Sequence, residues 1–210
     1  MRLRNIKNSK NIISESKYIV LDPKQYKGNW KCLFNNDNPI HIEIGMGKGK
    51  FILENALKHP NINFIGIEKF DTVMVRALKK INKYNLKNLK LIRSDALLLN
   101  DIFDSEINVL YLNFSDPWPK LRHAKRRLTS EVFLNIYDYI FKDRKYIIMK
   151  TDNRNLFEFS IESFSEFGYK IKDISLDLHN SYIKDIITTE YEEKFINKNK
   201  VIYKMDCYKD

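Results

Sequence analysis

Four carboxylates follow apolar, strand-like runs at positions where a ligand could reach them. Glu43 precedes a glycine-rich turn, Glu68 ends a second run, and Asp95 and Asp116 follow a third and a fourth. Open α/β sheets bind ligands at the carboxyl ends of their strands, so we expect these acids at one edge. Such an edge repels a pyrophosphate but suits a ligand like S-adenosylmethionine, which carries positive charges and a ribose diol. The alternative for each acid taken alone is a helix cap.

The turn after Glu43 reads Gly45-Met46-Gly47-Lys48-Gly49 and lies between a predicted strand and a predicted helix. Glycines there let the backbone approach a ligand and present helix N–H groups to it. A dinucleotide-binding fingerprint needs its third glycine three residues after the second, where this chain has Lys50. The Gly-Lys-Ser/Thr of a phosphate-binding P-loop is absent as well. We therefore predict that Gly45 and Gly47 contact a cofactor, and a nucleotide-dependent dehydrogenase is disfavoured.

A stiff loop is expected where an apolar run meets the sequence Ser-Asp-Pro-Trp-Pro-Lys at positions 115–120. Pro117 and Pro119 each remove an N–H donor and force extended backbone on the preceding residue, so the strand must end near Ser115. A carboxylate, an aromatic face and a cation held together form a pocket suited to a planar, polar base. Trp118 either stacks on such a base or wedges the loop against the core.

The chain is strongly basic, with 37 Lys and Arg against 27 Asp and Glu and a net charge of +10. This excess favours a polyanionic partner, because neutralised phosphates release counterions. Lys120, Arg122, Lys125, Arg126 and Arg127 crowd eight positions directly after the stiff loop, without an acid among them. The alternatives are a solvated charge run and a nucleotide bias of the genome.

Strands and helices alternate along most of the 210 residues, which predicts a parallel sheet built from βαβ units. Predicted strands cover 40–44, 63–68, 89–93, 109–114 and 146–149, and predicted helices cover 51–58, 71–84, a segment capped by Thr129, and 156–167. Two further strand-like runs, 169–178 and 201–208, have no good helix between them. The segment separating them is predicted to be a functional loop.

Several classes of protein are disfavoured by composition. No apolar stretch approaches the ~18 residues of a membrane span, and the amino terminus lacks the core of a signal peptide. Cys32 and Cys207 are predicted to be buried small hydrophobes in a reducing, cytoplasmic setting. The four histidines lack metal-ligand spacing, so we expect no metal. We expect one domain over 1–210, with 1–30 as a basic N-terminal extension.

Taken in order, the motifs of this chain resemble those of the bacterial tRNA (guanine-N7)-methyltransferase family. The resemblance covers nearly the whole chain and is carried by residues 40–49, 64–68, 111–120, 122–128, 150–154 and 189–195. The Ser-Asp-Pro-Trp-Pro-Lys run with its basic tail is highly specific, whereas the glycine turn marks only the broader class of methyltransferases. No motif position departs clearly from the family pattern.

The resemblance implies a Rossmann-like α/β fold of the class I methyltransferases, with a seven-stranded, mostly parallel sheet, an antiparallel last strand and helices on both faces. It implies S-adenosylmethionine as cofactor and methyl transfer to N7 of the variable-loop guanosine at position 46 of tRNA. The implied cofactor contacts are Glu43, Glu68, Asp95 and Asp116, the implied substrate contacts are Lys120, Asp152, Thr189, Glu190, Tyr191 and Glu192, and the implied tRNA contacts are Arg122, His123, Lys125, Arg126 and Arg127.

Asp116 is our candidate catalytic residue. A carboxylate there could stabilise the positive charge that N7 methylation leaves on guanine, or accept from guanine N1–H and the exocyclic amine. The base contact could instead fall to Asp152 or Glu192. We expect a tRNA partner, no membrane, no obligatory protein partner, and either a monomer or a homodimer. The rival functions are methylation of a protein or small molecule, and RNA binding without catalysis.

Overall fold

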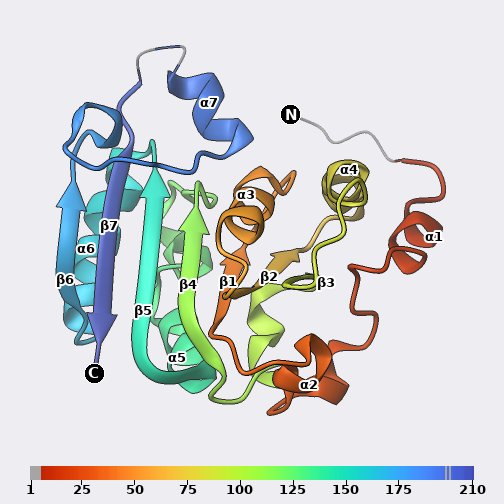
Figure 1. Ribbon diagram of the computed structural model, residues 1–210. Coiled ribbons are helices and arrows are strands. Elements are labelled where there is room, and N and C mark those ends of the chain that lie inside the picture. The colour runs from red at the N-terminus through yellow and green to blue at the C-terminus, as the bar shows by residue number, and fades with distance from the viewer. Residues whose placement is uncertain (1–5, 197, 199) are drawn as a thin grey trace.

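The computed structural model describes residues 6–196, 198 and 200–210. Seven strands form one sheet in the order β3-β2-β1-β4-β5-β7-β6 (Figure 1). The strands are β1 (Ile40–Ile44), β2 (Asn63–Glu68), β3 (Leu89–Arg93), β4 (Ile107–Asn113), β5 (Phe141–Thr151), β6 (Lys170–Ser175) and β7 (Tyr203–Lys209). The first five pair in parallel, and β7 runs antiparallel to both β5 and β6. The predicted class I methyltransferase topology is confirmed.

Helices flank the sheet on both sides (Figure 1). The α-helices are α1 (Ser9–Ser14), α2 (Trp30–Phe34), α3 (Lys50–Lys58), α4 (Asp71–Ile81), α5 (Glu131–Ile140), α6 (Arg154–Glu166) and α7 (Glu190–Ile196). In the described residues the chain also forms short 3-10 helices: η1 (Pro23–Tyr26), η2 (Ala96–Asp101), η3 (Leu121–Arg126) and η4 (Leu178–Asn180). No helix in the described part of the chain is long and apolar enough to cross a membrane.

Two hydrophobic clusters fill the two sides of the sheet. Neighbouring strand residues point to opposite faces, and in β2 Phe64 joins the cluster of α3 and α4 whereas Ile65 joins the cluster of α5 and α6. Both side chains are buried. The close packing also explains Gly49, where the backbone has a φ of +75° and an added Cβ would lie 3.0 Å from the Cβ of Ala77. This glycine lets the start of α3 approach α4 and fixes the turn at the end of β1.

Three local predictions are wrong. The helix predicted to start with Thr129 as its cap has Ser130 at that position instead, because the buried Thr129 hydroxyl lies 2.8 Å from Ser160 Oγ. Cys32 is exposed on α2, whereas Cys207 is buried as predicted. The segment predicted as a loop between the last two strands contains α7, whose start is capped by Thr189 and Glu192, and the apolar pattern does not reveal this polar cap.

Candidate active site

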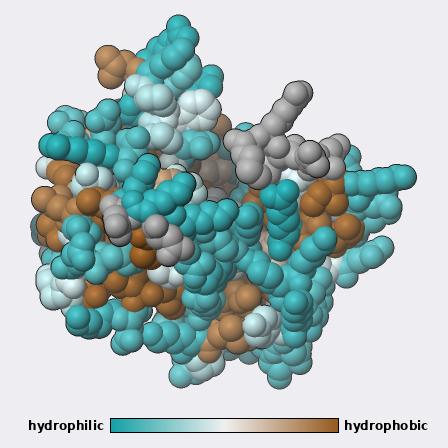
Figure 2. Space-filling model, turned by 90° about the horizontal axis from the view of Figure 1, so that it is seen from above, coloured by the Kyte–Doolittle hydropathy of each residue, from teal (hydrophilic) through white to brown (hydrophobic). Residues whose placement is uncertain are grey.

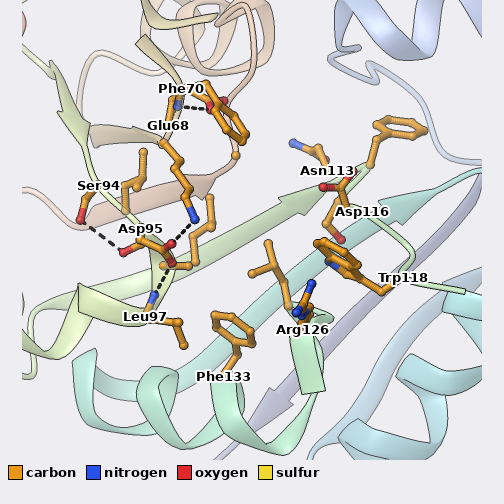
Figure 3. A pocket seen from close by; sticks show the side chains of 18 of the residues that line it. Glu68, Phe70, Ser94, Asp95, Leu97, Asn113, Asp116, Trp118, Arg126 and Phe133 are labelled. Atoms are coloured by element: carbon orange, nitrogen blue, oxygen red, sulfur yellow. Dashed lines mark hydrogen bonds and ion pairs between the residues drawn. The ribbon is translucent and has the colours of Figure 1, made fainter. Parts of the chain in front are cut away.

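The strand-final acids gather at the carboxyl edge of the parallel strands, which is the upper edge in Figure 1. Viewed from above, this edge is largely hydrophilic with smaller apolar areas (Figure 2). A cavity of about 560 Å³ opens there between the ends of β2, β3 and β4 (Figure 3). Its lining includes Gly45, Glu68, Phe70, Asp95, Leu97, Asp116, Trp118, Arg126 and Phe133.

Glu68 connects the glycine turn to the start of α4. Its carboxylate accepts hydrogen bonds from the backbone N–H groups of Gly47, at 3.1 Å, and Phe70, at 2.9 Å. Burial raises the pKa of Glu68, and the two N–H donors oppose that shift. Each carboxylate oxygen keeps a second lone pair, so Glu68 can still accept from a ligand in the cavity.

Asp95 lines the same cavity and also caps a helix. Its side chain caps η2 by accepting from the Leu97 N–H at 3.0 Å, and it pairs with Lys69 at 2.5 Å. Burial works against ionisation, but the Leu97 N–H and Lys69 keep the pKa of Asp95 below its usual value. Asp95 is therefore a helix cap, as the alternative interpretation of the strand-final acids states. Its carboxylate nevertheless lines the cavity, so Asp95 remains part of the candidate site.

Glu43 lines a second pocket of about 210 Å³ that shares Gly45, Asn113 and Phe114 with the first cavity. The Asn113 side-chain amide donates to Glu43 Oε1 at 2.9 Å, while Oε2 is buried without any partner among the described residues. Burial raises the pKa of Glu43 to about 7, and Asn113 and Lys150 oppose the shift. A buried acceptor with no donor fits a cationic or N–H-bearing ligand group.

The loop after β4 presents Asp116 and Trp118 to the cavity (Figure 3). Asp116 is exposed, and Trp118 is half-buried. Trp118 has a φ of +41°, so the prediction that Pro119 forces extended backbone on it is wrong. The Trp118 ring meets the His123 ring edge-on at 5.8 Å, and the Arg126 guanidinium carbon lies 5.0 Å from its centre. Trp118 therefore lies in the cavity wall rather than in the core, which corrects the wedge alternative.

Arg127 has a structural role in addition to the one predicted for it. The side chain is buried, donates to the Pro117 and Trp118 carbonyl oxygens at 3.1 Å each, and places its guanidinium over the Phe159 ring. This guanidinium is directed inward and not toward solvent, and the predicted tRNA contact at Arg127 stays a prediction. Arg127 holds the proline-rich loop from inside.

The remaining cations of this segment face solvent. Lys120, Arg122, Lys125 and Arg126 are exposed, and His123 is half-buried. Among the residues that the structure describes, none of these four cations lies in an ion pair. They form a cationic rim beside the cavity, which we define as Lys120, Arg122, Lys125 and Arg126.

The start of α7 covers the second pocket from the other side. Thr189 and Glu192 form a reciprocal cap: the Glu192 N–H donates to Thr189 Oγ1 at 3.0 Å, and the Thr189 N–H donates to Glu192 Oε2 at 3.2 Å. The Glu192 side chain is fully buried, and the predicted substrate contact at Glu192 stays a prediction. The Thr-x-x-Glu spacing is the sequence signal that could have identified this helix.

The other predicted substrate contacts differ in position, and Lys120 and Asp152 are not among the residues that line the two pockets. Glu190 and Tyr191 line the second pocket. Glu190 pairs with Lys80 of α4. The half-buried Asp152 follows β5 and accepts from the Tyr191 hydroxyl at 3.4 Å.

Two residues of the site were given no role from the sequence. Asn113 orients Glu43, and Lys150 pairs with Glu192 at 2.6 Å in the interior. Asn113 is the last residue of β4 and Lys150 is the last but one of β5, and the two are register partners. A polar residue directly after a short apolar run, as in residues 110–112 and 147–149, is the signal that could have identified them.

Comparison with known proteins adds sequence and structural relatives. A family model described as "Putative methyltransferase" matches residues 37–205. A tRNA (guanine-N(7)-)-methyltransferase of Lachnoclostridium phytofermentans is 50% identical over 100% of this chain and 99% of its own. One of Streptococcus uberis is 47% identical over 99% and 100%.

Among solved structures, an antibiotic-related methyltransferase has a TM-score of 0.69 at 18% identity, covering 92% of this chain and 97% of its own. A 16S rRNA (adenine(1408)-N(1))-methyltransferase from Catenulisporales acidiphilia, solved with its cosubstrate SAM, has a TM-score of 0.61 at 14% identity, covering 90% and 92%. At these identities the likeness supports the fold alone.

Proposed function

Because the chain belongs to the tRNA (guanine-N(7)-)-methyltransferase family, we propose that it transfers the methyl group of S-adenosylmethionine to N7 of the variable-loop guanosine at position 46. Family membership makes it a methyltransferase of tRNA. The donor, the target position and the role of each residue are the proposal. The main support for this proposal is that an acid-lined cavity and the cationic rim, whose members form no ion pair within the described part of the chain, lie at one sheet edge.

The residues of the two pockets fit the cofactor. The unpartnered Oε2 of Glu43 would accept from the cofactor's ammonium, and Glu68 would accept from its ribose hydroxyls. Leu97 and Phe70 offer apolar surface for a base beside Asp95. When bound, S-adenosylmethionine supplies an electrophilic methyl group on a sulfonium and becomes S-adenosylhomocysteine.

The protein's contribution to the reaction is positioning and electrostatics. Guanine N7 presents an in-plane lone pair, so no proton has to leave before the new C–N bond forms. Methylation leaves the guanine ring cationic, and the Asp116 carboxylate at the cavity entrance is placed to stabilise that charge or to accept from guanine N1–H and its amine. Either role requires an ionised Asp116 on a rigid loop. Arg127 would keep the loop rigid by donating to its Pro117 and Trp118 carbonyl oxygens from inside.

The cationic rim would hold tRNA phosphates on the side of Trp118. Phosphate contacts fix the register of a nucleic acid without reading its sequence. Trp118 presents a ring in the cavity wall that Arg126 already covers on one side, so a base would stack against the free part of that ring. Stacking of this kind contributes roughly 1–3 kcal/mol per base.

The test is methylation of an unmodified tRNA transcript with labelled S-adenosylmethionine. N7-methylguanosine makes the chain cleavable by borohydride and aniline, so we expect label in tRNA and scission at position 46. A transcript with adenosine at that position is the matched control and should remain intact. Label on protein, scission elsewhere, or no label in the wild-type reaction would each reject the proposal.

A further inference from the structure

Lys150 is a buried cation at the centre of the site that the proposed reaction does not use. Its side chain is 4% exposed. The ammonium group donates to Glu192 Oε2 at 2.6 Å and to the Ile187 carbonyl at 2.9 Å, and it lies 5.1 Å from the centre of the Phe51 ring. Burial lowers the pKa of Lys150, and Glu192 and Glu43 oppose that shift. One side chain of β5 thus contacts the segment before α7, α7 itself and α3.

The attachment of α7 to the rest of the protein depends on charge. Glu192 is the only residue of Glu190–Ile196 that is buried. Its second oxygen lies 3.0 Å from His179 Nε2. The other polar links are partly exposed: Lys50 pairs with Glu193 at 2.5 Å and donates to Thr188 Oγ1 at 2.7 Å, and Lys80 pairs with Glu190. Removing one partner costs more in a buried pair than in a partly exposed one, so loss of the Lys150–Glu192 pair should displace α7 most.

The same lysine is tied to the loop that carries Asp116. The Phe114 N–H donates to the Lys150 carbonyl at 2.8 Å, and the Phe114 ring lies 5.0 Å from that of Tyr191 on α7. Phe114 and Tyr191 both line the second pocket, as does Glu43. Displacement of α7 would therefore remove one wall of the pocket and leave Glu43 facing solvent.

We propose that Lys150 is a positioning residue whose ion pair with Glu192 holds α7 as one wall of the second pocket, which Glu43 and Tyr191 also line. This proposal rests on the proposed function. It assigns the Thr189–Glu192 segment the role of forming the pocket wall: Glu192 points inward to Lys150, and Tyr191 lines the pocket that the substrate would enter. Removing either charge of the pair leaves the other buried and uncompensated, whereas removing both leaves a neutral contact.

The first test follows α7 directly, without any substrate. Lys150→Met removes the charge while retaining the length of the side chain, and hydrogen exchange would be measured on the amides of α7 and of β5. We expect the α7 amides to exchange at least about tenfold faster in Lys150→Met than in the wild type, while the β5 amides exchange at an unchanged rate. The reason is that a weakly attached helix unfolds locally while the sheet stays folded. The matched control is Lys145→Met on the same strand, which breaks the half-buried pair with Asp138 far from the site. Unchanged exchange in α7 would overturn the proposal.

The second test separates positioning from direct contact with guanine. Lys150→Met should raise the KM for tRNA by about tenfold with a smaller change in kcat, and Lys150→Met combined with Glu192→Gln should recover part of that loss. If Glu192 touched the base, Glu192→Gln alone would lower kcat and the double variant would show no recovery, which would overturn the proposal. A wild-type enzyme that methylates no tRNA would reject the proposed function, while the exchange result would still decide the role of Lys150.

Discussion

The two sides of the candidate site use charged residues in opposite ways. On the α7 side, Lys150 and Glu192 are buried and paired with each other. On the η3 side, Arg122 and Arg126 are exposed and unpaired within the described residues. The two sides lie at one sheet edge and flank the same loop after β4.

The difference shows which charges organise the protein and which are available to a partner. A buried pair in a low-dielectric interior fixes geometry, because either charge alone would be costly there. An exposed cation is hydrated and contributes little to stability, but it gains affinity when a phosphate releases its counterions. Arg127 directly follows η3 in the sequence, but its side chain is buried, as are those of Lys150 and Glu192.

The largest effect is expected at Asp116, between the two sides. Asp116→Asn should lower kcat by at least about 100-fold, since a fixed charge near the reacting ring is lost. Its melting temperature should stay close to that of the wild type, because Asp116 is exposed. Single-turnover rates with tRNA, together with thermal unfolding, measure both. Near-normal turnover would remove Asp116 from the mechanism.

Arg127 should affect stability where its neighbour Arg126 does not. Arg127→Met leaves the Pro117 and Trp118 carbonyls without their donor and should lower the free energy of unfolding by about 1–3 kcal/mol. Arg126→Met is the matched control and should unfold like the wild type, since its side chain is exposed. Urea titration of both variants gives the comparison. If the two variants were equally stable, the burial of Arg127 would not contribute to the stability of the protein.

Glu43 should make stability depend on pH. Burial raises its pKa to about 7 from 4.5, so between these values the folded state binds more protons than the unfolded state, and stability falls as pH rises. Glu43→Gln removes that penalty and should stabilise the free protein by about 1–3 kcal/mol at pH 8, with little gain at pH 5.

Denaturation of wild type and Glu43→Gln at the two pH values measures this effect. The same variant should bind S-adenosylmethionine more weakly at pH 8, because the buried acceptor no longer carries charge. A stability gain that does not change with pH would contradict ionisation of Glu43 as its source.

The smallest effect is expected on the cationic rim. Arg126→Ala should weaken tRNA binding by roughly three- to tenfold and reduce the slope of log K against log salt by about 1, as loss of one phosphate contact predicts. Cofactor affinity should be kept. Binding isotherms at several salt concentrations test this, and an unchanged slope would remove Arg126 from the phosphate contacts.

Much of the fold was readable from local patterns. The strands at 40–44, 63–68 and 89–93 end within the predicted bounds, because their apolar runs are interrupted by glycine or acid side chains at the sheet edge. Helix α7 was missed because its attachment is polar: its cap and its one buried side chain are Thr189 and Glu192, which read as surface residues in a sequence.

The sequence alone determined the parallel sheet, the alignment of acids at its edge, and the basic segment that follows the proline-rich loop. Only the tertiary structure decided which of those charges face solvent. Arg126 and Arg127 are adjacent and chemically identical, yet one lies over the Trp118 ring in the cavity wall and the other donates inward to backbone carbonyls. Burial depends on what packs around a side chain from distant parts of the chain, here Phe159 of α6, and residue type does not encode it.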